Sequence, residues 1–398
     1  MINEKMRRLG AKRSVIRELF EYGKRRKSEI GEENVHDFSL GNPSVPAPRE
    51  VNEAIKALVD CESPLLLHGY TSAQGDLSVR RAVAEYIKSS TSYEADADKL
   101  YMTVGAAGAL VAALGAVVNE GEEVIVVSPY FPEYRVFIEN LGGTVREVGC
   151  DERTFEPDPE KIGEAINENT AAIILNYPNN PTGALMSEET LLEICSVLKA
   201  GEEKYGKPIY IIADEPYREL VYDGVNVPYI PLYYPNTIVC YSFSKSLSIP
   251  GERIGYALVA NEAKDCGAVY EALCGAARAK GYVCAPSLLQ KILPMCLGLT
   301  SDISIYDRNR KLLYSALSEY GFEVVKPSGA FYMFVKAPKG DANEFSELAK
   351  KYELLLVPSD DFGLGGYVRI SYCVSTEQIE NSLPAFKKLA EASGIKTP

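Results

Sequence analysis

The stretch Tyr241-Ser-Phe-Ser-Lys245-Ser-Leu-Ser-Ile-Pro-Gly251-Glu-Arg253 follows an apolar run at 237–240. The apolar run predicts a buried strand, with Lys245 at its carboxyl end. A lysine partly removed from water has a lowered pKa and can form a Schiff base with a carbonyl compound. The serines and Arg253 suit a phosphate on that same compound. The segment therefore predicts pyridoxal phosphate, although taken alone it fits a solvated turn equally well.

Upstream of this stretch, apolar runs alternate with helical patterns. Continuous apolar runs predict strands covered on both faces, at 123–128, 144–148, 171–176 and 208–213. Helical spacing is found at 50–60, 77–89, 134–141, 159–166 and 187–205. Helices that connect successive strands indicate crossover connections and a mostly parallel sheet. We expect an α/β fold with a seven-stranded type of sheet, in a large domain over residues 49–290.

The pattern changes after about residue 290. A long helical stretch at 302–320 precedes apolar segments at 322–325 and 331–335. A helix near 343–351, short strands at 354–357 and 367–371, and a final helix from Thr376 follow. We expect a smaller α+β domain made of residues 291–398 together with the amino-terminal segment 1–48.

Composition excludes several classes of protein. The net charge of −13 argues against general nucleic-acid binding, and no apolar run is long enough to span a membrane. With only two histidines, a metal site is not expected and histidine acid–base catalysis is nearly excluded. Nine scattered cysteines favour a reducing, cytoplasmic setting. The first 27 residues hold ten Lys or Arg against three Glu; a solvated helix or an arm packed on another subunit is favoured over a basic arm that binds nucleic acid or a membrane.

Polar groups follow five of the predicted strands, at the sheet edge where α/β proteins bind ligands. Gly105 opens a helix whose free N–H groups suit a phosphate. The other four strand ends are followed by an aromatic pair (Tyr130-Phe131), an amide (Asn180), a carboxylate with a phenol (Asp214 and Tyr217), and the amine of Lys245. This convergence favours a binding site over five unrelated loops.

The ordered set Asn180-Pro-Thr-Gly183, Asp214-x-x-Tyr217 and Ser242-x-Ser-Lys245 with Arg253 resembles the fold-type I, class I/II aminotransferases, which are pyridoxal phosphate-dependent. The resemblance covers nearly the whole chain, because Gly41-Asn-Pro43 and Tyr367-Val-Arg369-Ile-Ser371 match as well. Each motif is weak by itself, but their order and spacing are specific.

The resemblance implies a role for each matching position. Lys245 would be the Schiff-base lysine and proton carrier, and Asp214 would pair with the pyridine nitrogen. Tyr217 and Asn180 would donate to the ring oxygen, and Phe131 would stack on the ring. The phosphate would be bound by the backbone of Gly105, Ala106 and Ala107, by Ser242, Ser244 and Arg253, and by Tyr70 from a neighbouring subunit. Arg369 and the backbone of Gly41 would bind the substrate carboxylate.

The resemblance therefore implies a homodimer with shared active sites and a ping-pong transfer of an amino group between an L-amino acid and a 2-oxo acid. One departure is Ala106-Ala107, where many relatives carry hydroxyl or lysine side chains. In some aspartate-using relatives that lysine also contacts the second carboxylate of the substrate. Arg278 could make this contact instead, although a solvated helix arginine is the simpler interpretation. A carbon–sulfur β-lyase acting on cystathionine-like substrates is an alternative on the same scaffold. A non-catalytic regulator is disfavoured because the segment before Gly41 is too short for a DNA-binding module.

Overall fold

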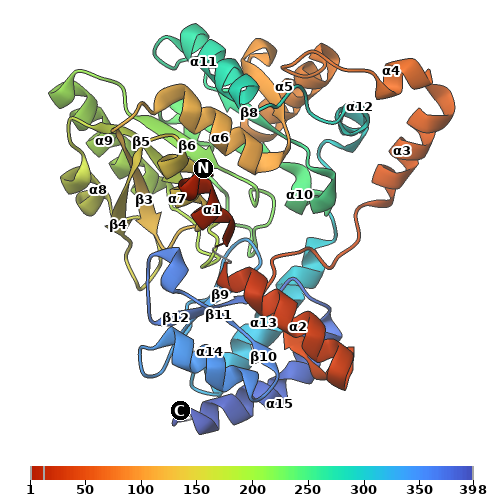
Figure 1. The fold of residues 1–398 in the computed structure, drawn as a ribbon, viewed down its shortest axis with the longest axis vertical. Helices are drawn as coiled ribbons and strands as arrows, with labels where there is room; N and C mark the ends of the chain where they lie inside the picture. The colour runs from red at the N-terminus through yellow and green to blue at the C-terminus, as the bar shows by residue number, and fades with distance from the viewer. Residues whose placement is uncertain (1, 12–13, 397–398) are drawn as a thin grey trace. The chain divides into compact units, whose positions relative to one another are not determined.

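The computed structural model describes residues 2–11 and 14–396, and most of its helices and strands are labelled in Figure 1. Contacts divide the chain into two compact units. The large unit comprises Val45–Ile303 and Ser328–Ala330, and the small unit comprises Met1–Ser44, Ser304–Pro327 and Phe331–Pro398. The sequence analysis expected these boundaries at residues 48 and 290. Residues 287–296 belong to the large unit because their helix, α12, packs against two helices of that unit, α3 and α5.

The large unit is built on a seven-stranded sheet with the order β2-β8-β7-β6-β5-β3-β4. The strands are β2 (Leu100–Thr103), β3 (Glu123–Ser128), β4 (Thr144–Gly149), β5 (Thr170–Leu175), β6 (Tyr210–Asp214), β7 (Thr237–Ser242) and β8 (Gly255–Val259). Only β8 runs antiparallel to its neighbours β2 and β7 within this sheet. The expectation of a mostly parallel sheet in an α/β fold is confirmed.

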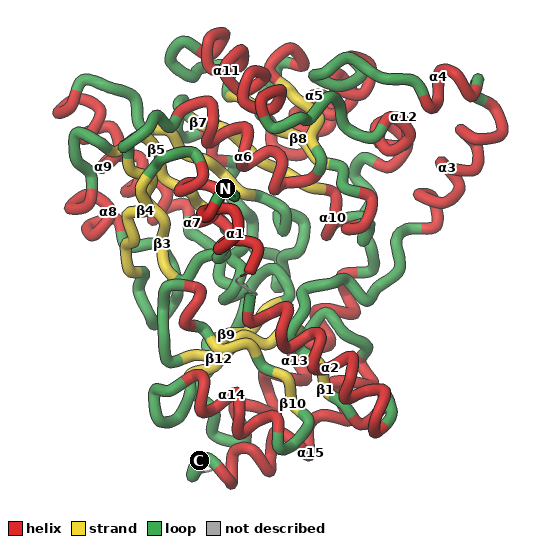
Figure 2. Tube along the Cα trace, in the orientation of Figure 1, coloured by secondary structure: helices red, strands yellow, loops and turns green. Residues whose placement is uncertain are grey.

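Both faces of this sheet are covered, as the continuous apolar runs predict. Alternate residues of the central strands, such as Ile174 and Ile212, form one core with helices α6, α7 and α11. The residues between them, such as Ile173 and Ile211, are fully buried on the opposite face. Figure 2 shows these strands surrounded by helices. Rigid support on both faces fixes the strand ends, and therefore the loops that follow them.

The helices of the large unit are α3 (Arg49–Cys61), α4 (Pro64–His68), α5 (Leu77–Thr91), α6 (Gly105–Val117), α7 (Glu133–Asn140), α8 (Pro159–Ala165), α9 (Glu188–Tyr205), α10 (Phe243–Ser246), α11 (Cys266–Ala279) and α12 (Ser287–Cys296). The sequence pattern predicts α3 and α5 to α9 to within a few residues, whereas α4, α10, α11 and α12 were not predicted. Side-chain caps fix several starts: the Ser187 hydroxyl accepts from the backbone N–H of Thr190 at 3.1 Å at the start of α9. Gly206 ends that helix in the left-handed conformation.

The small unit is an α+β arrangement. Its strands are β1 (His36–Asp37), β9 (Tyr332–Lys336), β10 (Leu354–Leu355), β11 (Val357–Pro358) and β12 (Tyr367–Ser371). β12 lies between β11 and β9 in an antiparallel sheet, and β1 pairs with β10. The helices are α1 (Glu4–Ala11), α2 (Val15–Ile30), α13 (Ile303–Glu319), α14 (Ala342–Lys350) and α15 (Thr376–Ala392). Of the apolar segment 322–325, Val324 makes one isolated bridge to Val335.

The basic amino-terminal segment forms helices α1 and α2, while its residues 12 and 13 lie outside the described ones. α2 buries Leu19, and its Arg26 makes a bidentate ion pair with Glu353. Several of these positive charges are therefore used within the small unit. Within the described parts of the chain, every helix is too short or too polar to cross a membrane.

Candidate active site

The candidate site is built on one edge of the seven-stranded sheet. β2, β3, β5, β6 and β7 all end at this edge because they are mutually parallel. The antiparallel strand β8 begins there instead, with Gly255 beside Thr103 and Ser242. Arg253 therefore reaches the same edge from the amino-terminal side of its strand. This single geometry gathers the loops that the sequence analysis singled out one by one.

Asp214, the last residue of β6, is a buried carboxylate with only one oxygen satisfied. Its Oδ2 accepts a hydrogen bond from the Tyr134 hydroxyl at 2.5 Å. Its Oδ1 is buried with no hydrogen-bond partner among the described residues. Burial raises the pKa of Asp214 to about 7, against the lowering effect of the Tyr134 bond. A cation placed at Oδ1 would supply the missing partner and favour the ionised form.

Tyr134 connects two of the predicted residues. It lies on α7, is fully buried, and packs edge-on against the ring of Phe131 with 5.7 Å between ring centroids. Its hydroxyl donates to Asp214 as described above. The turn that leads into α7 brings the two residues together, since the backbone N–H of Tyr134 donates to the carbonyl of Phe131 at 3.1 Å. One side chain, that of Tyr134, therefore contacts both the carboxylate and the aromatic ring.

Asn176, at the end of β5, joins the amide loop to the same carboxylate. Its side-chain nitrogen donates to the backbone carbonyl of Asp214 at 2.8 Å, and its side-chain oxygen accepts from the backbone N–H of Asn180 at 2.9 Å. Asn180 and Tyr217 are both buried. The loop around Asn180 is further held by Asn179, whose side-chain oxygen accepts from the backbone and hydroxyl of Thr182. The amide loop is thus positioned by bonds to the strand that carries Asp214.

Gly105, Arg253 and two serines form a compact anion-binding group. A Cβ added at Gly105 would lie 2.5 Å from the Nη2 atom of Arg253, and Gly105 adopts φ +78°. Only glycine allows this approach. The Ser244 hydroxyl lies 2.6 Å from that of Ser242 and accepts from Arg253 at 3.4 Å. Guanidinium, hydroxyls and the amino terminus of α6 together suit a phosphate.

Lys245 lies on the short helix α10, directly after β7, and is half-buried. Ser242 caps this helix by accepting from the backbone N–H of Ser244 at 3.2 Å. The serine therefore serves both the helix start and the anion-binding group. The lysine is placed at the same sheet edge as Asp214, whose neighbour in the sheet register is Cys240 of β7.

Gly41 and Arg369 belong to the small unit, where the structure brings them together around Tyr332. Arg369 on β12 is only 2% exposed, and its guanidinium lies over the rings of Tyr332 and Phe362 at 4.8 and 5.2 Å. Its Nη2 donates to the carbonyl of Ser39 at 2.6 Å. A Cβ at Gly41 would clash with the Tyr332 hydroxyl. Arg369 is therefore not a solvent-exposed arginine of the strand surface, because the aromatic rings cover its guanidinium.

The remaining predicted residues lie nearer the surface. Ala106 is half-buried and Ala107 exposed in the first turn of α6. Tyr70, between α4 and α5, is 89% exposed. Arg278 is exposed near the end of α11, in line with the simpler interpretation of a solvated helix arginine.

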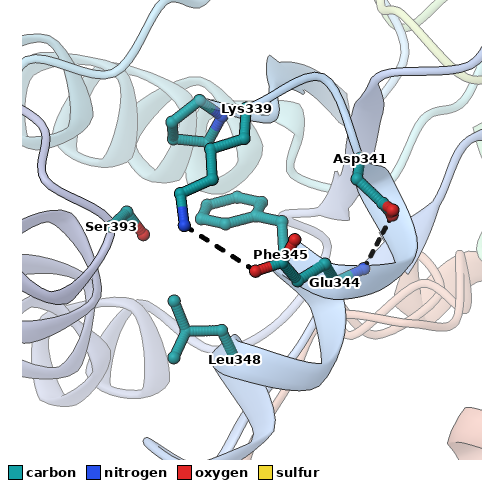
Figure 3. A pocket seen from close by; sticks show the side chains of 7 residues that line it. Lys339, Asp341, Glu344, Phe345, Leu348 and Ser393 are labelled. Carbon is teal, nitrogen blue, oxygen red and sulfur yellow. Dashed lines mark hydrogen bonds and ion pairs between the residues drawn. The ribbon is translucent and has the colours of Figure 1, made fainter.

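A separate small hollow lies in the small unit beside Phe345 and Leu348 (Figure 3). Its volume of about 20 Å³ is close to that of a single water molecule. Lys339 Nζ lies 3.7 Å from a Glu344 carboxylate oxygen, and the Glu344 backbone N–H donates to Asp341 at 2.9 Å. These polar groups are paired with one another, so they are not available to bind a ligand in the hollow.

Tyr134, Asn176 and Tyr332 are the residues of this arrangement that the sequence analysis did not name. Asn176 ends an apolar run, a position that could have marked it. Tyr134 and Tyr332 lie within a helix and a strand, where a tyrosine looks like an ordinary core residue. Only the three-dimensional structure shows that their hydroxyl groups face Asp214 and the backbone of Gly41.

The sequence matches the family model of aminotransferase class I and II over residues 33–386. It is 32% identical to an aspartate aminotransferase of Pyrococcus horikoshii, covering 96% of this chain and 95% of that one. It is 30% identical to aromatic-amino-acid aminotransferase 2 of Thermococcus litoralis, covering 94% and 95%. Its structure is similar to the crystal structure of an aminotransferase from Eubacterium rectale, with a TM-score of 0.97, 52% identity and coverage of 98% and 99%.

The fold is therefore that of the fold-type I pyridoxal phosphate-dependent enzymes, with an α/β large unit. The chain belongs to the class I and II aminotransferase family and is an aminotransferase. These comparisons give no support to the carbon–sulfur lyase alternative. The buried, half-satisfied carboxylate of Asp214 and the anion-binding group around Gly105 fit pyridoxal phosphate.

Proposed function

We propose that this aminotransferase binds pyridoxal phosphate at the carboxyl edge of the seven-stranded sheet and moves an amino group between an L-amino acid and a 2-oxo acid. The observation that carries the proposal is the buried Oδ1 of Asp214, which has no partner among the described residues. An ionised carboxylate there would keep a ring nitrogen protonated. When bound, the cofactor supplies an electron sink for the electron pair that stays on the substrate Cα when its proton is removed.

The phosphate is assigned to the group formed by Gly105, Ser242, Ser244 and Arg253, with the backbone of Ala106 and Ala107 in the first turn of α6. Free N–H groups at a helix amino terminus and a guanidinium favour a doubly charged anion. Ala106 and Ala107 contribute no side-chain donor. Backbone geometry and Arg253 would therefore carry more of the phosphate binding than in relatives with hydroxyl or lysine side chains here.

Lys245 is assigned the covalent attachment and the proton transfer. A lysine amine that is released during the reaction can take a proton from the substrate Cα and return it to the cofactor. Its position on α10, directly after β7 and at the sheet edge that carries Asp214, supports this role. Asn180 and Tyr217 are assigned hydrogen bonds to the ring oxygen, and Phe131 is assigned to stack on the ring.

Arg369 is assigned to the substrate carboxylate, with the backbone of Gly41 beside it. The two aromatic rings hold the guanidinium in one orientation, and a planar guanidinium can bind a carboxylate through two parallel bonds. Lysine could not replace this geometry.

We also propose that the enzyme is a homodimer with shared active sites. Leu65 is 87% exposed and Leu66 and Tyr70 lie exposed on the same segment, which is unusual for a protein surface that faces only water. Tyr70 is assigned to the phosphate of a neighbouring subunit. The nine cysteines form no disulfide in the described residues, which supports the expected cytoplasmic location.

The test is a half-reaction screen. Purified holoenzyme is mixed with single L-amino acids, starting with aspartate, aromatic amino acids and alanine, and the visible absorbance of the bound cofactor is followed. We expect at least one amino acid to convert this absorbance with no 2-oxo acid present, and a 2-oxo acid to restore it.

Lys245→Ala should lose this conversion, whereas Lys264→Ala, which removes an exposed lysine of the large unit, should keep it. Native turnover by Lys245→Ala would overturn the proposal. Release of pyruvate and ammonia from cystathionine would instead point to the lyase.

A further inference from the structure

A cavity of about 230 Å³ lies in the large unit. Its lining residues include four tyrosines, an arginine and a glutamate: Tyr86, Tyr229, Tyr241, Tyr256, Arg218 and Glu219. Neither the sequence motifs nor the proposed transamination assigns a role to these residues. The volume is large enough for a small molecule and not only for a water.

Glu219 presents a half-satisfied carboxylate at this cavity. Its Oε1 accepts a hydrogen bond from the Tyr241 hydroxyl at 2.8 Å. Its Oε2 is buried and has no hydrogen-bond partner among the described residues. Burial raises the pKa of Glu219. A buried carboxylate with an unused oxygen is unfavourable unless a proton or a cation compensates it.

Tyr229 supplies a second unused polar atom in the same cavity. This residue is only 3% exposed, and its hydroxyl has no hydrogen-bond partner among the described residues. Its ring is held in place by the guanidinium of Arg218 at 4.8 Å and by the ring of Tyr93 at 5.6 Å. The phenolic oxygen is thus fixed, and it can accept a hydrogen bond from a ligand.

Arg218 does not provide the missing charge for Glu219. Its guanidinium pairs with Glu215 at 3.2 Å and donates to the backbone carbonyls of Val227 and Pro228 at 2.9 and 3.4 Å. Two carboxylates therefore share one nearby guanidinium, and the direct ion pair is made with Glu215. An ionised Glu219 would therefore need another cation to balance its charge.

We propose that this cavity binds an ammonium group, either the free ammonium ion or the end of a small primary amine. The N–H donors would reach Glu219 Oε2, an acceptor that lacks a partner among the described residues. Tyrosine rings in the cavity wall favour such a cation through their π faces. The described residues hold no cluster of three or more metal-type side chains, so a multivalent metal ion is not the expected occupant.

The site is connected to the catalytic segment by a short path. The Tyr241 hydroxyl that donates to Glu219 also lies 3.0 Å from the hydroxyl of Ser246, the residue after Lys245. A cation bound at Glu219 is therefore separated from α10 by one tyrosine. The proposal concerns a second binding site and stands independently of the roles assigned to Asp214 and Arg369.

The test measures the melting temperature of the holoenzyme in chloride salts at constant ionic strength. Ammonium and methylammonium are compared with sodium, potassium and tetramethylammonium, each titrated to saturation. We expect a saturable rise of about 2–4 °C with ammonium and methylammonium, as linkage requires for a ligand that binds the folded state.

Glu219→Gln keeps the size and shape of the side chain but removes its charge, and it should abolish this rise. Glu188→Gln is the matched control, because Glu188 also accepts from a tyrosine hydroxyl, that of Tyr233 at 3.0 Å, but is exposed on α9.

A rise that is kept in Glu188→Gln and lost in Glu219→Gln supports the proposal. Equal rises with sodium or potassium would overturn it in favour of an alkali-ion site. A rise that persists in Glu219→Gln, or no saturable effect in the native enzyme, would overturn it as well, since Glu219 would then be neutralised by a proton.

Discussion

Asp214 and Glu219 lie on the same segment at the end of β6 and have the same local arrangement. In each carboxylate, one oxygen accepts a hydrogen bond from a tyrosine hydroxyl. Tyr134 donates to Asp214 at 2.5 Å, and Tyr241 donates to Glu219 at 2.8 Å. In each, the other oxygen is buried and lacks a partner among the described residues. Burial raises the pKa of both groups. The family motif explains the first carboxylate and contains nothing about the second.

The comparison shows that a buried carboxylate with one unpartnered oxygen can indicate a binding site even where no sequence motif marks it. At Asp214 the partner that we propose is the cationic ring nitrogen of the cofactor. At Glu219 the same reasoning leads to an external cation, because Arg218 is paired with Glu215. The two sites differ in their neighbours: Asp214 faces the anion-binding sheet edge, whereas Glu219 lines a cavity of tyrosines. Substitutions at the two positions should therefore separate catalysis from binding.

The largest difference is expected in activity. Asp214→Asn removes one partner of a buried ion pair, which typically costs about 3–5 kcal/mol. If that loss falls on the transition state, the half-reaction slows by about a hundredfold to several thousandfold. Glu219→Gln should stay within a few-fold of the native rate. Single-turnover kinetics with one amino donor measure both.

A near-normal Asp214→Asn enzyme would contradict the electron-sink assignment. Equal losses in the two variants would show that both carboxylates serve the reaction, and the contrast between the two sites would disappear.

The sequence predicts the first of these sites because its residues follow strand ends. Asp214 ends its apolar run, and Lys245 and Asn180 follow theirs within five residues; the parallel order of the strands brings such positions to one edge. The sheet itself is predictable for the same reason, since its strands are continuous apolar runs.

The second site could not be predicted in this way. Tyr86, Tyr241 and Tyr256 come from a helix and two strands, and a tyrosine in such elements gives no sign of which way its hydroxyl points. The antiparallel strand β8 was also not recognised, although it is what places Arg253 beside Gly105. Contacts between residues far apart in the chain determine these features, and single-sequence patterns do not encode them.

The second prediction concerns the pH dependence of stability in the cofactor-free protein. The folded pKa of Asp214 is about 7, against about 4 in an unfolded chain. Between these values the folded state binds the extra proton, so the free energy of unfolding falls as the pH rises from 4 to 7. The contribution of this single group is on the order of 4 kcal/mol. Urea unfolding at a series of pH values should show a shallower fall for Asp214→Asn.

Asp151 gives the control of opposite sign. Its bonds with Arg153 lower its pKa to about 2, so the stability it contributes is present above about pH 4 and lost as the pH falls towards 2. Asp151→Asn should leave the region between pH 4 and 7 unchanged. If Asp214→Asn and the native protein show the same dependence, the buried carboxyl is not the titrating group.

The third prediction tests the tyrosine that holds Asp214. Tyr134→Phe removes the hydroxyl donor, so the pKa of Asp214 should rise further. A hydrogen bond to a charged group contributes about 1.5–3 kcal/mol, and its loss should weaken cofactor binding by about ten- to a hundredfold. The pH above which the cofactor binds tightly should also move upwards. Titration of cofactor into the cofactor-free protein at several pH values measures both effects.

Tyr130→Phe is the matched control for this substitution. The Tyr130 hydroxyl also bonds a carboxylate, that of Glu147, and its ring stacks on that of Tyr134 at 6.4 Å. It should change neither the cofactor affinity nor its pH dependence. A shift of equal size in both variants would mean that packing of the aromatic cluster, and not the bond to Asp214, sets the affinity.

The smallest expected effect is on the stability of Glu219→Gln in buffer free of ammonium. The amide can still accept from the Tyr241 hydroxyl, while the unfavourable burial of a charge is removed. Because a neutral hydrogen bond contributes only about 1 kcal/mol net, we expect the free energy of unfolding to stay within about 1 kcal/mol of the native value or to rise above it. Urea unfolding of the holoenzyme measures this.

The free energy of unfolding of Glu219→Gln decides whether Glu219, like Asp214, lacks a compensating partner within the protein. A loss of about 3 kcal/mol or more would mean that the protein itself compensates an ionised Glu219, since breaking a buried pair has that size of effect. There would then be no uncompensated charge in the tyrosine-lined cavity and no reason for an external cation to bind there. A neutral or stabilising substitution, combined with loss of the ammonium effect, would instead show that Glu219 is kept in an unfavourable state for the sake of a ligand.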